Sequence, residues 1–195
     1  MSLHPAKNRE QALALVCAVS VSLALVVKPT AAQKRRTVRV PKEIVQQLIK
    51  DEEIRELIRL RPDGSAENLV AESIDLNRDG EPELEVHGIG VGICGAANCP
   101  TWIHSKVGTG YQLLLDAGSI QRVEPQRTFT NGYRDIMTSI HGSAWDSDLT
   151  LYKFDGKQYQ RVRCFYRSYR YKDRRSRMRE WRGARITPVK CEPKQ

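Results

Sequence analysis

From Asn68 to about Phe165, apolar and polar residues alternate along the chain, and this period of two restricts the fold more than any other feature. Side chains that alternate in this way point to opposite faces of a β-strand. Clusters of glycine, asparagine and aspartate divide the pattern into short runs, which is typical of turns between strands. Strands are expected on both sides of a loop at 75–83, and around 101–106, 111–116, 136–140, 149–154 and 159–164. The sequence therefore predicts a mainly β fold, built as an antiparallel β meander.

The same part of the chain contains an internal duplication. Residues 79–84 (Asp-Gly-Glu-Pro-Glu-Leu) correspond to residues 131–136 (Asn-Gly-Tyr-Arg-Asp-Ile), 52 positions later, and a His-Gly pair follows each copy at 87–88 and 141–142. Self-similarity at a fixed spacing indicates repeated structural units. We therefore expect residues 66–165 to form a β domain of two related units, arranged as a sandwich or as part of a propeller.

A helical segment is expected before the β domain, over residues 41–62. Pro41 suits the first position of a helix, and two sets of apolar residues follow it with helical spacing: Ile44, Val45, Leu48 and Ile49, then Ile54, Leu57 and Ile58. The second set is rotated about the helix axis relative to the first. Two short helices, or one bent helix, packed against the sheet would explain this pattern. The basic, polar leader at 33–40 is expected to be disordered.

The N-terminus has the layout of a secretory signal peptide. Lys7 and Arg9 precede an apolar run from Ala12 to Val27, and small residues follow it up to Ala32. This order of basic, apolar and small residues is typical of signal peptides. Residues 1–32 are therefore expected to be removed near Ala32, which would place the protein outside the cell or in the periplasm. An uncleaved membrane anchor is the alternative.

Export would make the four remaining cysteines meaningful, because disulfides form and persist in oxidising compartments. Four cysteines allow three pairings. We favour Cys94 with Cys99, which closes a tight loop, and Cys164 with Cys191, which closes a long one. A four-cysteine zinc site needs two closely spaced pairs, and the second pair is too widely spaced.

Oxygen-bearing side chains are concentrated in the loop that precedes residue 84: Asp75, Asn77 and Asp79 alternate, Gly80 follows, and Glu83 adds a carboxylate. Calcium binds six to eight oxygens, and a glycine lets closely spaced ligands converge on one point. An EF-hand is disfavoured because its twelfth position would be Val86 instead of glutamate. The alternative without metal is a set of turns closed by side chains of Asp75 and Asn77.

This D-x-N-x-D-G-x-x-E motif resembles the calcium loop of FG-GAP and VCBS-type repeats, which occur in integrin alpha propellers and in many secreted bacterial proteins. The Phe-Gly and Gly-Ala-Pro elements of the full repeat are absent from this chain. The resemblance implies one calcium ion held by the side chains of Asp75, Asn77, Asp79 and Glu83 and by the carbonyl of Glu81. The second copy has Arg127, Phe129 and Asn131 at the first three of these positions, so only one site is expected.

The C-terminal part of the chain is strongly basic. Thirteen lysines and arginines stand against three acidic residues from Arg161 onward, whereas residues 33–160 carry sixteen basic and nineteen acidic residues. Such asymmetry indicates a charged appendage, here an arginine-rich extension over 166–195. Arginine forks bind phosphate and carboxylate groups, which makes six arginines candidate ligands of an anionic partner: Arg174, Arg175, Arg177, Arg179, Arg182 and Arg185. The partner could be an anionic surface, a polysaccharide, an envelope protein or, with less support, nucleic acid, and a solvated hairpin without a partner is the alternative.

A catalytic function is the runner-up hypothesis. Three histidines, His87, His104 and His141, could serve a hydrolase, the last with Ser143, Asp146 and Asp148 close by in the sequence. No nucleophile elbow, no histidine pair at metal-binding spacing and no glycine-rich phosphate loop accompanies them. We therefore expect a secreted, non-enzymatic binding or structural module of the cell envelope with one calcium-stabilised loop.

Overall fold

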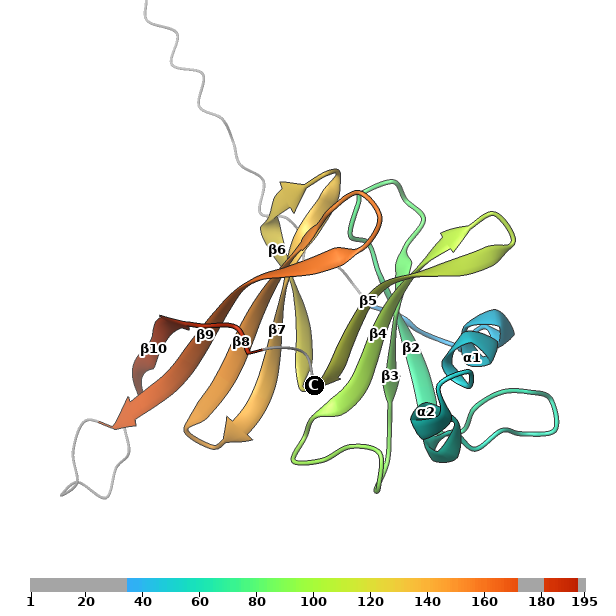
Figure 1. Cartoon of the computed structure of the whole chain (residues 1–195), viewed down its shortest axis with the longest axis horizontal. Coiled ribbons are helices and arrows are strands. Elements are labelled where there is room, and N and C mark those ends of the chain that lie inside the picture. The colour runs from blue at the N-terminus through green and yellow to red at the C-terminus, as the bar shows by residue number, and fades with distance from the viewer. Residues whose placement is uncertain (1–34, 172–180, 193–195) are drawn as a thin grey trace, which may run out of the picture. The chain divides into compact units, whose positions relative to one another are not determined.

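The computed structural model describes residues 35–171 and 181–192, which form two antiparallel five-stranded sheets and two short helices (Figure 1). The first sheet has the order β1-β2-β3-β4-β5 and contains β1 (Thr37–Val38), β2 (Leu69–Ile74), β3 (Glu83–Gly88), β4 (Cys99–Val107) and β5 (Gly110–Ile120). The second sheet has the order β10-β9-β8-β7-β6 and contains β6 (Arg122–Thr130), β7 (Tyr133–Ser143), β8 (Asp146–Phe154), β9 (Tyr159–Tyr171) and β10 (Trp181–Val189). The mainly β fold is confirmed.

From β2 onward, each strand pairs with the next strand in its own sheet, as in a meander. The chain passes from the first sheet to the second at Gln121, between β5 and β6. A core of aliphatic and aromatic side chains joins the facing sides of the two sheets, from Ile74, Ile103 and Leu115 on the first to Ile136 and Tyr152 on the second. The two sheets therefore share one buried core.

The helices α1 (Lys42–Leu48) and α2 (Glu52–Leu57) confirm the expected helical segment as two short helices. Pro41 stands at the N-cap of α1, and the side chain of Asp51 caps α2 by accepting hydrogen bonds from the amides of Glu53 and Ile54. The Asp51 side chain thus satisfies amides that have no partner within the helix, whereas Pro41 makes no side-chain cap bond. Ile44 and Val45 are buried in a second core cluster with Trp102 and other residues of the first sheet. The helices therefore cover the face of that sheet that the second sheet does not contact.

The leader expected to be disordered over 33–40 contributes β1 instead, which pairs with β2 through Thr37 and Val38. The contacts of Arg35 explain in part why this segment is ordered. Its guanidinium lies 2.5 Å from the Glu85 carboxylate on β3 and donates a 2.7 Å hydrogen bond to the carbonyl of Val123 on β6. One side chain of the leader therefore connects both sheets.

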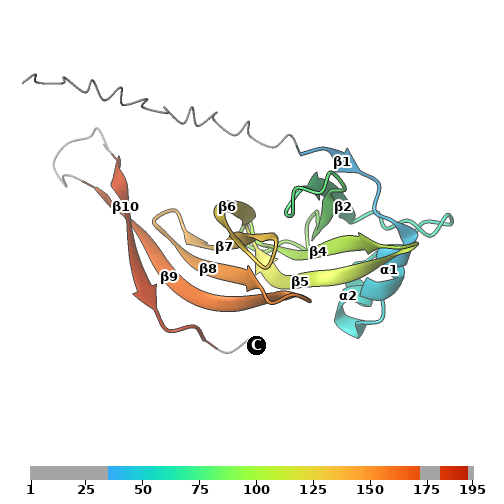
Figure 2. The same cartoon turned by 90° about the horizontal axis from the view of Figure 1, so that it is seen from above.

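Most of the described part of the arginine-rich extension expected over 166–195 belongs to the second sheet. β9 continues to Tyr171, and β10 pairs with it from Trp181 to Val189 (Figure 2). The Cys164–Cys191 disulfide closes this hairpin at its base. Arginines of the expected extension therefore occupy positions within paired β-strands.

Both expected disulfide pairings, Cys94–Cys99 and Cys164–Cys191, are confirmed. In the part of the chain that the structure describes, no helix has the length and apolar character needed to cross a membrane. The signal segment expected at 1–32 lies outside the described residues.

Candidate functional site

The loop with the candidate calcium ligands is the turn between β2 and β3, and it is folded by its own side chains. The carboxylate of Asp75 accepts a hydrogen bond from the amide of Arg78, Asn77 Oδ1 accepts one from the amide of Asp79, and Asp79 Oδ1 accepts one from the amide of Glu81. Arg78 has a φ of 65°, which favours glycine or a residue held by local hydrogen bonds. The loop thus has the form of successive side-chain turns.

Glu83 is the buried member of this loop. Glu83 is only 1% exposed, and its Oε2 accepts a 2.8 Å hydrogen bond from the amide of Leu76. Burial raises the pKa of Glu83 to about 7, and the nearby charges of Asp79 and Asp75 raise it further, whereas backbone hydrogen bonds lower it. The charges of Asp79 and Asp75 therefore disfavour the ionised form of the buried Glu83 carboxyl.

The corresponding carboxylate of the second copy is stabilised by protein groups. Asp135, 2% exposed, accepts hydrogen bonds of 2.6 and 2.7 Å from the hydroxyls of Thr128 and Thr130. The ammonium of Lys153 lies 3.6 Å from the same carboxylate. The positions of Glu83 and Asp135 therefore differ in what compensates the charge: two hydroxyls and a cation at Asp135, and backbone amides at Glu83.

The two corresponding turns lie against each other. The amide of Arg134 donates a 2.7 Å hydrogen bond to the carbonyl of Leu76, and Asn77 Nδ2 donates one of 3.3 Å to the hydroxyl of Tyr133. The guanidinium groups of Arg78 and Arg134 lie 4.6 and 4.9 Å from the centre of the Phe129 ring, within range of cation–π attraction. Phe129, which replaces a candidate ligand in the second copy, thus holds the two turns together.

The donor chemistry of the β2–β3 loop fits a hard cation, since three carboxylates and one amide oxygen are within one turn. Glu83 is the strongest indication, because a bound cation would compensate its buried charge. The side chains are not gathered around one point, however, and over residues 35–171 and 181–192 no cluster of three or more histidine, cysteine or acidic side chains could hold a metal ion. Asn77 points its Nδ2 toward Asp79 Oδ2, at 2.7 Å, so calcium binding would require this amide to turn.

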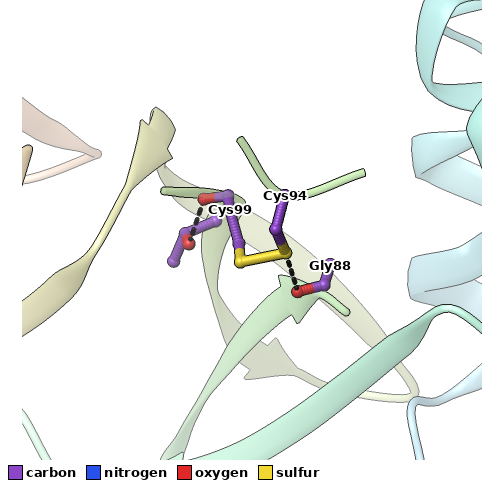
Figure 3. Close-up of a disulfide and its surroundings, with 4 residues drawn as sticks. Gly88, Cys94 and Cys99 are labelled. Carbon is purple, nitrogen blue, oxygen red and sulfur yellow. Dashed lines mark hydrogen bonds between the residues drawn. A yellow bond between two sulfur atoms is a disulfide. The ribbon is translucent and has the colours of Figure 1, made fainter. Parts of the chain in front are cut away.

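The loop between β3 and β4 contains the Cys94–Cys99 disulfide (Figure 3). The sulfur of Cys94 lies 3.4 Å from the carbonyl oxygen of Gly88 at the end of β3. Two hydrogen bonds connect this loop to the second sheet, because Asn98 Nδ2 donates to the carbonyl of His141 and Asn98 Oδ1 accepts from the amide of His141. The β3–β4 loop is therefore fixed at its base and at the end of β7.

The β9–β10 hairpin carries six arginines and no acidic residue on its two strands. Arg163 and Arg185 are exposed. Arg167 donates a 2.8 Å hydrogen bond from Nε to the hydroxyl of Ser147, and its guanidinium lies 5.6 Å from the centre of the Tyr169 ring. Of the six arginines proposed as anion ligands, Arg182 and Arg185 lie on β10, and four lie outside the described residues: Arg174, Arg175, Arg177 and Arg179.

The three histidines occupy different places. His104 is 1% exposed, and burial lowers its pKa to about 4; it pairs in register with Leu84, which contributes to the core beneath the helices. His87 lines a cavity on the opposite face of the first sheet, and His141 lies on β7. Ser143 donates its hydroxyl hydrogen bond to Asp146 within the β7–β8 turn. The hydrolase hypothesis gains no support from this arrangement.

The cavity beside His87 was not expected from the sequence. It has a volume of about 320 Å³, and its polar lining includes Arg35, Glu72, Glu85 and His87. Glu85 is 6% exposed, and burial raises its pKa to about 7 although the charge of Arg35 lowers it. Alternation along β3 places Glu83, Glu85 and His87 on one face, which is the only sequence signal for this polar row.

Comparisons of the chain with protein-family models, with curated proteins and with solved structures found no match in any of the three. The resemblance of the β2–β3 loop to FG-GAP and VCBS-type repeats therefore stays a prediction.

Proposed function

We propose that the protein is a non-enzymatic binding module of the cell envelope that contacts a polyanionic partner through the β9–β10 hairpin. The observation that carries this proposal is the charge of the hairpin: β9 and β10 together hold six arginines and no acidic residue. By backbone register, Arg170 on β9 pairs with Arg182 on β10. A bound anion would compensate this concentration of positive charge.

The chemistry of the side chains favours an anionic ligand. Arginine presents a planar fork of donors that suits phosphate, sulfate and carboxylate groups. Aromatic residues alternate with the arginines on β9, at Phe165, Tyr166 and Tyr169, and they add surfaces for stacking. The Cys164–Cys191 disulfide holds the two strands together, so the charges are arranged before a partner binds, which lowers the entropic cost of association.

The disulfides support a location outside the cytoplasm, because both are compatible with an oxidising compartment. We propose a secreted or periplasmic protein on this ground, together with the signal-like pattern of residues 1–32. In such a compartment, the available polyanions are acidic polysaccharides, envelope lipids and acidic proteins.

We further propose that the β2–β3 loop binds one calcium ion. The support is the contrast between Glu83 and Asp135, since among the described residues hydroxyl and ammonium groups contact Asp135 and a backbone amide contacts Glu83. Asp75, Asn77, Asp79 and the carbonyl of Glu81 would complete the ligands. Binding to the folded state alone would stabilise the fold.

Retention on immobilised heparin tests the anion-binding proposal. The variant Arg163→Ser/Arg185→Ser removes two exposed charges of the hairpin. The control variant Arg55→Ser/Arg59→Ser removes two exposed arginines near the helices and has the same net charge. We expect the hairpin variant to elute at clearly lower salt than the control. Equal elution of the two variants would show that net charge alone causes retention, and the proposal would fail.

A further inference from the structure

The loop between β3 and β4 presents apolar side chains to solvent. Residues 88–103 contain no charged residue, although 28% of the chain is charged. Val91 is fully exposed, at 106%, and Ile89 is 37% exposed. Gly90 and Gly92 on either side of Val91 have φ values of 98° and 90°, which other residues rarely adopt. The backbone, closed by the Cys94–Cys99 disulfide, therefore holds Val91 outward.

A second exposed apolar residue lies at the same end of the molecule. Trp145 is 39% exposed in the turn between β7 and β8. The paired hydrogen bonds between Asn98 and His141 bring the β3–β4 loop to the end of β7, four residues before Trp145. In Figure 1 the β3–β4 loop and the β7–β8 turn both lie at the lower end of their sheets.

Arginines of the β9–β10 hairpin are level with this turn. The amide of Tyr169 donates a 2.8 Å hydrogen bond to the carbonyl of Trp145. By register, Arg185 lies opposite Ser168 in the adjacent row, Arg170 lies opposite Arg182 in the row on the other side, and Arg167 is one row beyond Ser168. Two acidic residues are close, Asp146 opposite Ser168 and Asp148 opposite Tyr166. By register, four arginines and two acidic residues therefore occupy strand positions near this turn.

We propose that this end of the molecule docks onto a membrane surface rich in anionic lipid. The proposal rests on the anion-binding function of the hairpin and names its partner. Tryptophan is favoured at the interface between headgroups and acyl chains, and the strength of peripheral membrane binding grows with the buried apolar area and with attraction to anionic lipids. Each arginine near an anionic leaflet adds attraction. A polysaccharide would use the arginines alone and would leave Val91 and Ile89 without an apolar environment.

Sedimentation with vesicles tests this proposal. The purified protein is mixed with vesicles of phosphatidylglycerol and phosphatidylcholine, and separately with vesicles of phosphatidylcholine alone. We expect binding to the anionic vesicles only, and about tenfold weaker binding by Val91→Ser/Trp145→Ser, because the loss of a buried apolar side chain costs this much or more. The control is Val107→Ser, which changes an exposed valine at the other end of β4 and should bind like the unchanged protein.

Two further measurements separate the possible failures. Heparin retention and the circular dichroism spectrum should be the same for Val91→Ser/Trp145→Ser and the unchanged protein, so that a loss of vesicle binding is not caused by unfolding. Lipids brominated near the headgroup should quench tryptophan fluorescence of the unchanged protein, and Trp145→Phe should lose most of this quenching. The membrane proposal would be overturned if the unchanged protein bound heparin but not the vesicles. It would also be overturned if Val91→Ser/Trp145→Ser and Val107→Ser bound the vesicles equally. Either result would leave a polysaccharide or a protein as the anionic partner. If heparin did not retain the unchanged protein, the anion-binding proposal itself would be overturned.

Discussion

The backbone amide of Arg134 donates a 2.7 Å hydrogen bond to the carbonyl oxygen of Leu76. This bond joins the β2–β3 turn of the first sheet to the β6–β7 turn of the second. The two turns have similar sequences, but their buried carboxylates, Glu83 and Asp135, have different partners. Matched substitutions of these two residues can therefore distinguish a metal ligand from a carboxylate that only accepts hydrogen bonds.

Glu83→Gln and Asp135→Asn should have opposite effects on stability. The raised pKa of Glu83 means that its proton stabilises the fold below about pH 4.5 and that this stability is lost as pH rises through about 7. At pH 8 with chelator, Glu83→Gln should therefore raise the unfolding midpoint, whereas Asp135→Asn should cost about 1–3 kcal/mol, because two hydroxyls lose a charged acceptor. Urea unfolding of both variants measures this difference.

Calcium should stabilise the unchanged protein more than it stabilises Glu83→Gln. If the ion binds there, millimolar calcium raises the unfolding midpoint of the unchanged protein at pH 8 by binding the folded state alone. Glu83→Gln should lose most of this increase, and Asp135→Asn should keep it. Calorimetric titration that shows no heat at millimolar calcium, together with an unchanged midpoint, would contradict the calcium proposal.

His104 should make the protein sensitive to acid. Burial lowers its pKa from 6.5 to about 4 in the folded state, so the stability of the neutral form is present above pH 6.5 and is lost as pH falls toward 4. The full shift corresponds to about 3 kcal/mol. Replacement by leucine, which suits the neighbouring Leu84 and Leu113, should flatten the stability profile over this interval. Identical profiles for His104→Leu and the unchanged protein would show that His104 does not titrate as described.

Arg35 should stabilise the fold mainly by compensating Glu85. Removal of one partner of a buried ion pair costs about 3–5 kcal/mol, and the value here should lie at the lower end because the Arg35 side chain is 31% exposed. Arg35→Ala should thus be strongly destabilising at pH 8, and Arg35→Ala/Glu85→Gln should recover much of the loss. A double-mutant cycle by urea unfolding measures the coupling. Additive effects of the two substitutions would mean that Arg35 acts through its contacts with Val123 and Glu72.

The two disulfides should differ in their contributions to stability. The Cys164–Cys191 bridge spans 27 positions and Cys94–Cys99 spans 5, and the chain-entropy relation assigns them about 3.6 and about 2 kcal/mol. Cys164→Ser/Cys191→Ser should therefore lower the unfolding free energy more than Cys94→Ser/Cys99→Ser. A larger effect of the short bridge would indicate that the β3–β4 loop stabilises the fold through contacts, as its bonds to His141 would allow.

The main elements were predictable from the sequence because their signals are local. Alternation around β4, β5, β7 and β8 and the apolar spacing over residues 41–62 each depend on neighbouring side chains only. The β10 strand was missed because Gly183 and Pro188 are unfavourable within strands and because arginines obscure its alternation. Pro125 and the irregular pairing between Pro125 and Phe129 similarly obscured β6.

For the candidate functional residues, the sequence predicted the kinds of side chain but not their burial or their contacts. The sequence places Asp75, Asp79 and Glu83 in one loop, but the burial of Glu83 depends on the second sheet, which comes from residues far along the chain. The role of Arg35 depends on the same distant contact, with Val123. Val91 has no sequence signal of exposure at all, since an apolar residue in an uncharged stretch normally indicates a core position.

The dependence of heparin affinity on salt tests the central claim most directly. Binding through several arginines releases counterions, so the logarithm of the association constant should fall linearly as the logarithm of salt concentration rises. We expect a steep slope for the unchanged protein, a shallower slope for Arg163→Ser/Arg185→Ser, and no change for Arg55→Ser/Arg59→Ser. A slope that is the same in all three proteins, or affinity that does not depend on salt, would contradict an anion-binding surface on β9 and β10.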